Sequence, residues 1–589
     1  MTSGVRSIRI PVFYSHIFRK GKGVRVAANS GEEMSDQKLQ RSHLRQGENA
    51  SHTDRRRFLR RVAAGASGAM ALGLGLPAAA GRGASLSSGA NGSSQDTQRT
   101  KLAEKIRVDA AKLAGKRPQP EHPNNGEEDL YPNRIASYSK ALPHNELGEV
   151  DPNAYNALLA AMTSGRESDF ENIPLGLGRR LTNPQAALAF DLEGADSHHM
   201  AIAPAPTIAG PRAASELAEV YWMALARDVH FSDYASDATI AAAAAELSRF
   251  SDFRGPRAGG AVTPGTLFRG DTPGDLAGPY LSQFLWMDLP MGALLVPQRM
   301  QTTVFGDDSM TGYEEWLAVQ NGFQPGPNRF DATPRYIRNL RDLAQWVHVD
   351  ALYQAYHQAC LILLAIAPFD RGNPYMRSVC QDGFGTFGGP HILSLVTEVA
   401  TRALKAVWYQ KWSVHRRLRP EAMAGLVHLT RSGLANYPVN PEILDAQVLD
   451  RVHSAHGTYL LPMAFPEGCP THPSYGAGHA TVAGACVTIL KAWFDESFVL
   501  PRPVVPDSSG LSLVPYSGPD LTVGNELNKL AANVAIGRNA AGVHYRSDYS
   551  ESVHLGEELA LDILEEQKST YNETFSFTLT RFDGTTVTI

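Results

Sequence analysis

The stretch Thr471-His-Pro-Ser-Tyr-Gly-Ala-Gly-His-Ala-Thr481, with the apolar run 482–493 directly behind it, decides the fold. A glycine-bearing turn leads into a helical pattern whose apolar residues recur at every third and fourth position. The free backbone N–H groups at the start of such a helix form an anion-binding site. His479 lies in the first turn of this helix, and His472 precedes it in extended chain before a proline. The stretch therefore predicts an apolar helix whose N-terminus faces an anion, close to two histidines.

Helical patterns of this kind dominate the chain from about residue 126 onward, separated by long Pro/Gly-rich loops such as 253–280 and 495–520. Residues 575–589 differ, because their apolar and polar side chains alternate around Asp583-Gly584, which predicts a β-hairpin. The fold class is therefore mainly α, a helical bundle with a small C-terminal β-hairpin at 575–589. The predicted helices are 343–367, 392–411, 479–494, 525–536 and 550–567.

Composition narrows the function classes. Hydrophobic residues make up 43% of the 589 and charged residues 20%, which is typical of a globular protein and excludes a mainly disordered or coiled-coil chain. Four cysteines are too few for a disulfide scaffold, and they include no CxxC pair, which excludes a zinc ribbon or a thioredoxin motif. Residues 1–80 carry 14 Lys/Arg and 5 Asp/Glu, a net charge of +9. The net charge of the whole chain is −5, so residues 81–589 carry a net charge of −14. Because contacts to phosphates need a basic surface, we expect this acidic part of the chain to have no nucleic-acid partner.

The basic N-terminus resembles an export signal. Residues 55–60, Arg-Arg-Arg-Phe-Leu-Arg, match the twin-arginine pattern, and the uncharged 62–81 ends in the cleavable Ala78-Ala-Ala80. The alternative is a transmembrane anchor, but so many glycines and alanines supply little transfer energy. We therefore expect 1–80 to be a signal segment, or a shorter one if Met34 is the true start. The exported protein would be periplasmic or extracellular, without stable membrane insertion. Residues 81–125 are predicted to be a flexible linker or arm, and 126–589 the helical domain.

A second segment, Lys411-Trp-Ser-Val-His-Arg-Arg-Leu-Arg-Pro420, concentrates positive charge. Lys411, His415 and Arg419 are spaced at i, i+4 and i+8, so on one helix they would share a face. Pro420 would then end that helix, with Arg416 and Arg417 pointing elsewhere. The alternative is a solvated basic face at a helix end.

A third segment, Gly537-Arg-Asn-Ala-Ala-Gly-Val-His-Tyr-Arg-Ser-Asp548, pairs an arginine with a histidine. Arg538 and His544 are six residues apart and can reach one ligand only if the helix breaks between them, for which Gly542 is suited. His544 and Asp548 are four apart, so the carboxylate can orient the imidazole.

Two further patterns are interpreted as carrying no chemistry. Gly383-Phe-Gly-Thr-Phe-Gly388 fits the spelling of a dinucleotide-binding motif, but no strand precedes it, so we expect a glycine-rich loop. His198 and His199 are adjacent and would diverge in a regular element, which favours a polar loop over a metal site.

The three charged segments together predict a cradle for a tetrahedral or trigonal-bipyramidal oxyanion. Two arginines supply forked hydrogen bonds and a lysine supplies a point charge. A backbone amide at Gly478 and three histidines complete the set, and no carboxylate cluster suited to Mg²⁺ or Ca²⁺ accompanies it.

These ordered motifs resemble the vanadium-dependent haloperoxidases, whose relatives are the type 2 phosphatidic acid phosphatases. The resemblance covers about 411–548, and the flanks 416–421 and 467–475 resemble the bromoperoxidase branch. It implies a vanadate cofactor with vanadium(V) on a ring nitrogen of His544. It also implies that His479 takes a proton from incoming peroxide and that His472 marks a bromoperoxidase. Ala477 departs from the family, which usually has serine there, so one hydroxyl donor is missing.

The remaining implied roles concern charge and support. The resemblance makes Lys411 both a cofactor contact and a catalytic group, and it places Asp548 and His415 behind the site. The residues implied to contact vanadate are Lys411, Arg419, Ala477, Gly478, His479, Arg538 and His544.

The resemblance implies an enzyme that oxidises bromide or iodide with hydrogen peroxide to hypohalous acid, which halogenates a small organic acceptor. We also expect a homo-oligomer. One alternative is an acid phosphatase, in which the same cradle holds phosphate, His544 becomes phosphorylated and His479 acts as the acid. Another is a non-catalytic oxyanion-binding protein, although a pure binder needs no pair of histidines beside the anion.

Overall fold

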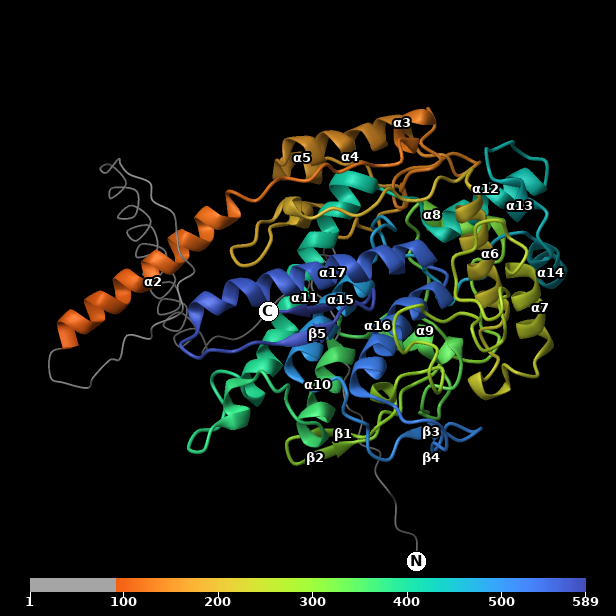
Figure 1. Ribbon diagram of the computed structural model, residues 1–589. Coiled ribbons are helices and arrows are strands. Elements are labelled where there is room, and N and C mark those ends of the chain that lie inside the picture. Colours follow the sequence, from red (N-terminus) through yellow and green to blue (C-terminus); the bar gives the residue numbers. More distant parts are fainter. Residues whose placement is uncertain (1–91) are drawn as a thin grey trace, which may run out of the picture. The chain divides into compact units, whose positions relative to one another are not determined.

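A computed structural model describes residues 92–589 of the chain (Figure 1). The predicted signal segment, the possible start at Met34 and the first part of the predicted linker lie outside these residues. The α-helices of the described part are α2 (Gly92–Ala114), α3 (Glu127–Leu130), α4 (Pro152–Ser164), α5 (Glu167–Glu171), α6 (Pro211–Leu225), α7 (Ala238–Leu247), α8 (Tyr313–Gln320), α9 (Leu340–Val349), α10 (Gln354–Ile366), α11 (Gly389–Tyr409), α12 (Pro420–Arg431), α13 (Pro441–Leu444), α14 (Gln447–His456), α15 (Gly478–Trp493), α16 (Val523–Ala540) and α17 (Arg546–Gln567).

Short helical segments and hairpins connect these helices. The short helical segments are η1 (Pro184–Leu188), η2 (Ser197–His199), η3 (Phe231–Asp233), η4 (Gln283–Leu285), η5 (Pro374–Arg377), the π-helical η6 (Gln410–His415) and η7 (Lys568–Thr570). The strands form three antiparallel pairs: β1 (Leu289–Met291) with β2 (Leu294–Val296), β3 (Val504–Pro506) with β4 (Leu513–Pro515), and β5 (Thr578–Thr580) with β6 (Thr586–Thr588).

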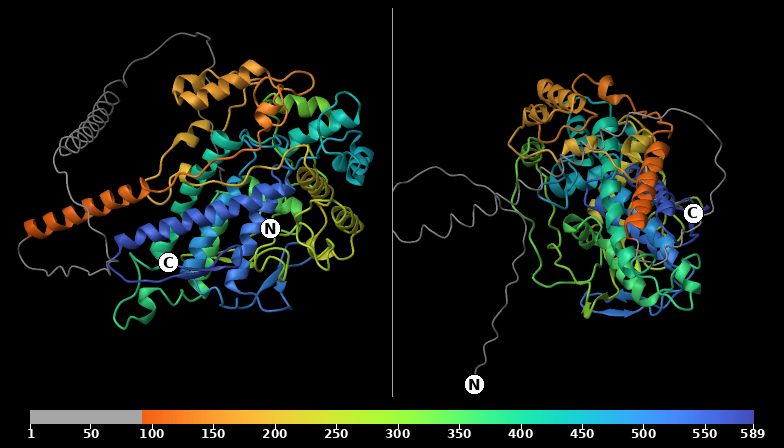
Figure 2. Two further views of the ribbon diagram at one scale, coloured as in Figure 1. Left: turned by 45° about the horizontal axis from the view of Figure 1, so that its top comes forward. Right: turned by 90° about the vertical axis from the view of Figure 1, so that its left-hand side faces the viewer.

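Helix α15 lies at the centre of the bundle and packs against α11, α16 and α17 (Figures 1 and 2). All of its residues except His479 are buried. Two glycines allow its backbone to approach that of α17: a Cβ at Gly484 would overlap the carbonyl of Val553, and one at Gly556 would overlap that of Thr481. The mainly α fold is confirmed, and the close contact brings α15 against the helix that follows His544.

The predicted helices are present, with one important difference. The pattern 343–367 forms two helices, α9 and α10, which are bent by 98° relative to each other. The backbone at Asp350 is extended, so the helix ends there although apolar residues continue beyond it. The predicted helices 392–411, 479–494, 525–536 and 550–567 correspond to α11, α15, α16 and α17.

The C-terminal end of the described chain has the predicted structure, whereas the N-terminal end contains a helix that was not predicted. The C-terminal hairpin is confirmed as β5–β6, with Gly584 in the left-handed region at its turn. Within the predicted linker, Gly92–Ala114 form α2, because good helix formers such as Ala, Lys, Glu and Arg fill its second half. Residues 115–125 are not helical, and Arg117 forms an ion pair with Asp562 of α17.

The described residues include no single helix that combines the length and apolarity of a membrane span; only the bent pair α9–α10 reaches that composition. The four cysteines, all in the described part of the chain, form no disulfide. Cys360, Cys469 and Cys486 are buried, and Cys380 is exposed.

Candidate active site

The candidate active site is formed where five segments meet. Lys411 comes from η6, Arg419 from the residue before α12, and Arg538 from the last turn of α16. The turn 471–477 enters α15, and His544 lies two residues before α17. All three charged segments predicted from the sequence therefore converge.

The predicted helix through Lys411, His415 and Arg419 is wrong. The chain passes from α11 into the π-helical η6 and leaves it at Arg416, whose φ is 37°. Pro420 does not end a helix but begins α12, where its missing N–H costs nothing. Lys411 and Arg419 reach the same site because the chain turns back between them, and such π-helical turns are common at functional sites.

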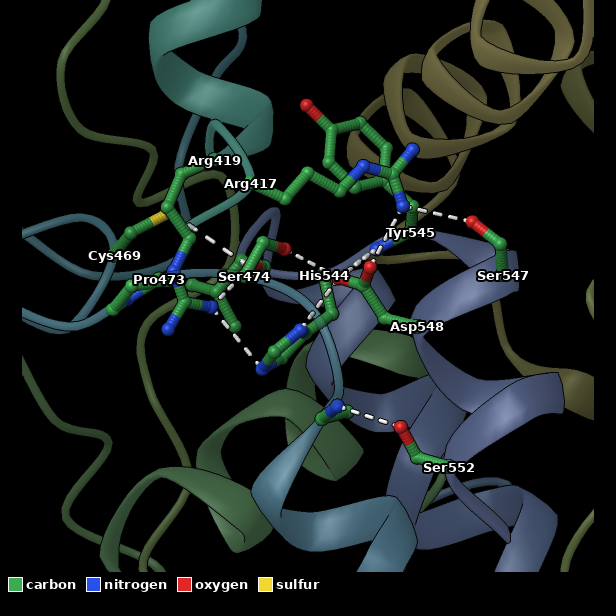
Figure 3. Close-up of polar contacts among 12 residues, drawn as sticks. Arg417, Arg419, Cys469, Pro473, Ser474, His544, Tyr545, Ser547, Asp548 and Ser552 are labelled. Carbon is green, nitrogen blue, oxygen red and sulfur yellow. Dashed lines mark hydrogen bonds and ion pairs between the residues drawn. The ribbon is translucent and has the colours of Figure 1, made fainter. Parts of the chain in front are cut away.

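His544 is held at both of its ring nitrogens. Its Nδ1 lies 2.7 Å from Oδ2 of Asp548, and its Nε2 lies 3.1 Å from Nη1 of Arg419 (Figure 3). Because the carboxylate accepts, Nδ1 carries the proton, and Nε2 presents its lone pair toward the arginine. The predicted break is also present, since α16 ends at Ala540 and Gly542 has a φ of 88°.

Asp548 is buried and accepts hydrogen bonds from several directions. Its Oδ2 accepts from the amide of Tyr545 at 3.1 Å and from the hydroxyl of Ser474, and its Oδ1 accepts from Nη1 of Arg417 at 2.8 Å. Burial alone would raise the pKa of Asp548, but Arg417 and the bond from His544 outweigh it and hold the pKa below its usual range. The carboxylate is therefore ionised and fixed, which fixes the imidazole of His544.

Arg419 is held by two backbone carbonyls and by the ring of His472. Its Nε donates to the carbonyl of His472 at 2.9 Å, and its Nη1 donates to the carbonyl of Val543 at 2.7 Å. Its Nη2 lies 2.9 Å from Nδ1 of His472, whose ring lies 4.8 Å from that of Trp408. His472 therefore contacts a cation of the cradle directly.

Lys411 and Arg538 complete the cation set. The Nζ of Lys411 donates to the carbonyls of Pro473 and Ser474 at 2.8 and 2.9 Å. One guanidinium nitrogen of Arg538 donates to the carbonyl of Val347 at 2.7 Å, and its buried Nε has no hydrogen-bond partner. Across residues 92–589, neither these two residues nor Arg419 forms an ion pair with a carboxylate.

The electrostatics of the cradle favour the binding of an anion. Burial lowers the pKa of Lys411 well below its ordinary value, and it lowers that of Arg538 to about 10. Burial also lowers the pKa of His472 and of His544 well below that of an ordinary histidine. Buried cations without a counter-charge are costly, so the site fits an oxyanion that would offset this penalty.

His479 lies at the more open side of the site and pairs with a carboxylate. Its Nε2 is 3.0 Å from Oδ1 of Asp350, so its Nδ1 remains free to accept a proton. Burial lowers the pKa of His479, and Asp350 partly opposes this effect. The break between α9 and α10 explains the contact, because it places Asp350 at the end of α9 instead of inside a helix.

Helix α15 begins at Gly478, one residue before the predicted start at His479, and Ala477 precedes it. Ala477 occupies the N-cap position without a side-chain cap, and its amide donates to the hydroxyl of Ser552 at 2.8 Å. Gly478 is buried next to the ring of Trp408, which lies 3.4 Å from where a Cβ would be.

His415 lies apart from the cradle, with its ring 4.8 Å from that of Tyr475. Both of its ring nitrogens are buried without a hydrogen-bond partner, and burial lowers its pKa to about 3. The glycine-rich pattern 383–388 precedes α11 as a loop. His198 and His199 lie in η2, where His198 pairs with Asp196, and no group of three metal-binding side chains occurs within residues 92–589.

Sequence reasoning missed three residues that support the site. Asp350 is an isolated carboxylate in an otherwise apolar helical pattern, and that isolation was the available signal. Arg417 was expected to point elsewhere but contacts Asp548, and Ser474 is a hydroxyl within the quoted turn that donates to the same carboxylate. Nothing in the local sequence distinguishes Arg417 from its neighbour Arg416, which pairs with Glu128.

Fold and site together define a helical bundle around a buried site suited to an oxyanion. The model of the second helical-bundle domain of VCPO matches residues 392–573. The chain is 41% identical over 588 residues to vanadium-dependent bromoperoxidases of Corallina pilulifera and Corallina officinalis, covering 83% of this chain and 98% of each relative. It is 39% identical over 488 residues to the vanadium-dependent bromoperoxidase of Ascophyllum nodosum, covering 78% and 87%.

A solved structure agrees with these relatives. The homohexameric structure of the second vanadate-dependent bromoperoxidase from Ascophyllum nodosum superimposes with a TM-score of 0.80 at 32% identity, covering 84% of this chain and 90% of that one. The chain belongs to the vanadium-dependent haloperoxidase family. It is therefore a vanadate-dependent haloperoxidase, and the phosphatase alternative has less support.

Proposed function

We propose that the chain is a bromoperoxidase that holds vanadate on Nε2 of His544 and oxidises bromide or iodide with hydrogen peroxide to hypohalous acid, which halogenates a small organic acceptor. One observation carries this proposal: Nε2 of His544 presents its lone pair within a cradle of buried cations that have no carboxylate partner. Bound vanadate supplies a Lewis acid that activates hydrogen peroxide toward a halide.

The other residues of the site would neutralise the oxyanion, polarise an oxygen and accept a proton. Lys411, Arg419 and Arg538 would neutralise the oxyanion, together with the Gly478 amide at the start of α15. Lys411 would also polarise the oxygen that the halide attacks. His479 would accept a proton from hydrogen peroxide at Nδ1, while Asp350 holds its Nε2 and stabilises the charge that forms.

His472 supports the choice of bromide. Its ring contacts both Arg419 and Trp408, so it can influence the charge of the cradle and the packing of the indole beside it. The missing hydroxyl at Ala477 weakens vanadate binding in this proposal without removing the site, because one hydrogen bond to a charged group contributes about 1.5–3 kcal/mol.

A bromination assay tests the proposal. The purified chain is stripped of vanadate and then assayed with monochlorodimedone, bromide and hydrogen peroxide, with and without added orthovanadate. Activity should appear only with orthovanadate and should be lost to excess phosphate, which competes for the same cradle. Full activity without orthovanadate and insensitive to phosphate would contradict the proposal.

We also propose export and self-association. The twin-arginine pattern at 55–60 supports cleavage near Gly81 and release into the periplasm or medium, which N-terminal sequencing of secreted protein would test. The homohexameric Ascophyllum nodosum neighbour supports a homo-oligomer, which light scattering after size-exclusion chromatography would test.

A further inference from the structure

We propose that Arg417 is a positioning residue for His544: it holds Asp548 in the one orientation that keeps the Nε2 lone pair of His544 directed at the oxyanion. This inference rests on the proposed role of His544 as the vanadate ligand. Arg417 itself does not reach into the cradle, so its effect passes through the carboxylate.

The side chain of Arg417 contacts the carboxylate that orients His544. Its Nη1 donates to Oδ1 of Asp548 and to the hydroxyl of Ser547, both at 2.8 Å (Figure 3). Its guanidinium lies 4.0 Å from the ring centre of Tyr545, the residue next to His544. Arg417 is buried, so these contacts are shielded from solvent.

The backbone of Arg417 reaches the other oxygen of the same carboxylate. Its carbonyl accepts from the amide of Ser474 at 3.1 Å, and the hydroxyl of Ser474 donates to Oδ2 of Asp548. One residue therefore restrains both oxygens of Asp548. Since Oδ2 is also the atom that faces Nδ1 of His544, rotation of the carboxylate would release the imidazole.

Helix α6 anchors the far side of Arg417. Oε2 of Glu216 accepts from Nη2 of Arg417 at 3.3 Å and from the hydroxyl of Ser547 at 2.6 Å. Its Oε1 accepts from the amide of Ser547 at 3.0 Å. The guanidinium is thus held between two carboxylates by bonds on two nitrogens, a geometry that the single ammonium of lysine does not reproduce.

Arg416 provides a matched control. It is the adjacent residue and its guanidinium also pairs with a carboxylate, that of Glu128. Its backbone N–H donates to the carbonyl of Lys411, but its side chain contacts neither Asp548 nor a residue of the cradle, so a substitution leaves that backbone bond in place. The experiment measures the Kd of stripped protein for orthovanadate by equilibrium dialysis, in the full-length wild type and in Arg417→Met, Arg417→Lys and Arg416→Met. The vanadium NMR shift of the bound oxyanion and the thermal midpoint are recorded for each.

Arg417→Met should raise the orthovanadate Kd by about tenfold or more and shift the vanadium signal, because partners behind a metal-ligating histidine typically control that much affinity. Arg417→Lys should raise the Kd at least about threefold, because lysine keeps the positive charge but cannot bond two carboxylates through two separate nitrogens. Arg416→Met should leave Kd and signal unchanged, even if its thermal midpoint falls.

Wild-type Kd and signal in Arg417→Lys, or in Arg417→Met, would overturn the inference. So would equal losses in Arg417→Met and Arg416→Met, since these would show a general effect of breaking an ion pair in this segment. Failure of the wild type itself to bind orthovanadate would instead overturn the proposed function, so the two failures are distinguishable.

Discussion

Removing the carboxylate of Asp350 should lower kcat/KM for hydrogen peroxide without loss of bound vanadate. Asp350 contacts His479 at 3.0 Å through Nε2 and leaves Nδ1 free to take the proton. A hydrogen bond between a charged pair contributes about 1.5–3 kcal/mol, so Asp350→Ala should lower kcat/KM for hydrogen peroxide by roughly 10- to 150-fold. Asp350→Asn keeps an oxygen that can accept from Nε2, so its loss should be smaller.

The pH dependence of these variants separates orientation from charge. Burial lowers the pKa of His479 below that of an ordinary histidine, and Asp350 opposes this shift. The neutral, proton-accepting form therefore persists to lower pH than in an ordinary histidine. Loss of the carboxylate should lower this pKa further and move the acid limb of kcat/KM to lower pH, while the maximum falls.

Asp342→Asn is the matched control for the Asp350 variants. Asp342 lies on the same helix α9, is buried and pairs with Arg338, but it does not contact His479. It should lower stability and leave kcat/KM at saturating vanadate near the wild-type value. Wild-type kcat/KM in Asp350→Ala, or an equal fall in Asp342→Asn, would refute this role for Asp350.

Three further predictions concern single positions. Ala477→Ser should lower the vanadate Kd by up to about tenfold, as measured by equilibrium dialysis. Because the serine supplies the missing N-cap of α15, it should also raise the free energy of unfolding of the stripped protein by about 1 kcal/mol. An unchanged Kd or an unchanged unfolding free energy would contradict the prediction. His472→Ala should retain vanadate but impair bromide oxidation far more than the easier iodide oxidation, and equal losses in side-by-side kinetics would make His472 merely structural. His415 has a pKa of about 3 in the fold and about 6.5 unfolded, so stability falls as pH drops between these values. Between pH 7 and 5 the wild type should lose about 2 kcal/mol more unfolding free energy than His415→Gln, and parallel losses in denaturant titrations would contradict this.

The segments that converge at the candidate site could be selected from the sequence because the chemistry of each segment is local. Lys411, Arg419, Arg538 and His544 lie within short motifs whose residue types suit an oxyanion, and only their convergence needed the fold. The helix termini were harder to predict. A π-helical turn at η6 and the left-handed Arg416 broke a helix that periodicity would have continued.

Asp350 and Arg417 escaped sequence analysis for different reasons. Asp350 acts because α9 ends at it, and an apolar pattern through 343–367 concealed that end. Arg417 differs from Arg416 only in which carboxylate tertiary packing brings near it, Asp548 or Glu128. Local pattern carries no information about such distant partners.

A crystal structure of the chain with orthovanadate would test the central claim most directly. The account predicts vanadium bonded to Nε2 of His544, with its oxygens within hydrogen-bond distance of Lys411, Arg419 and Arg538. Density for the oxyanion elsewhere, or a His544 that turns Nε2 away from it, would contradict the account.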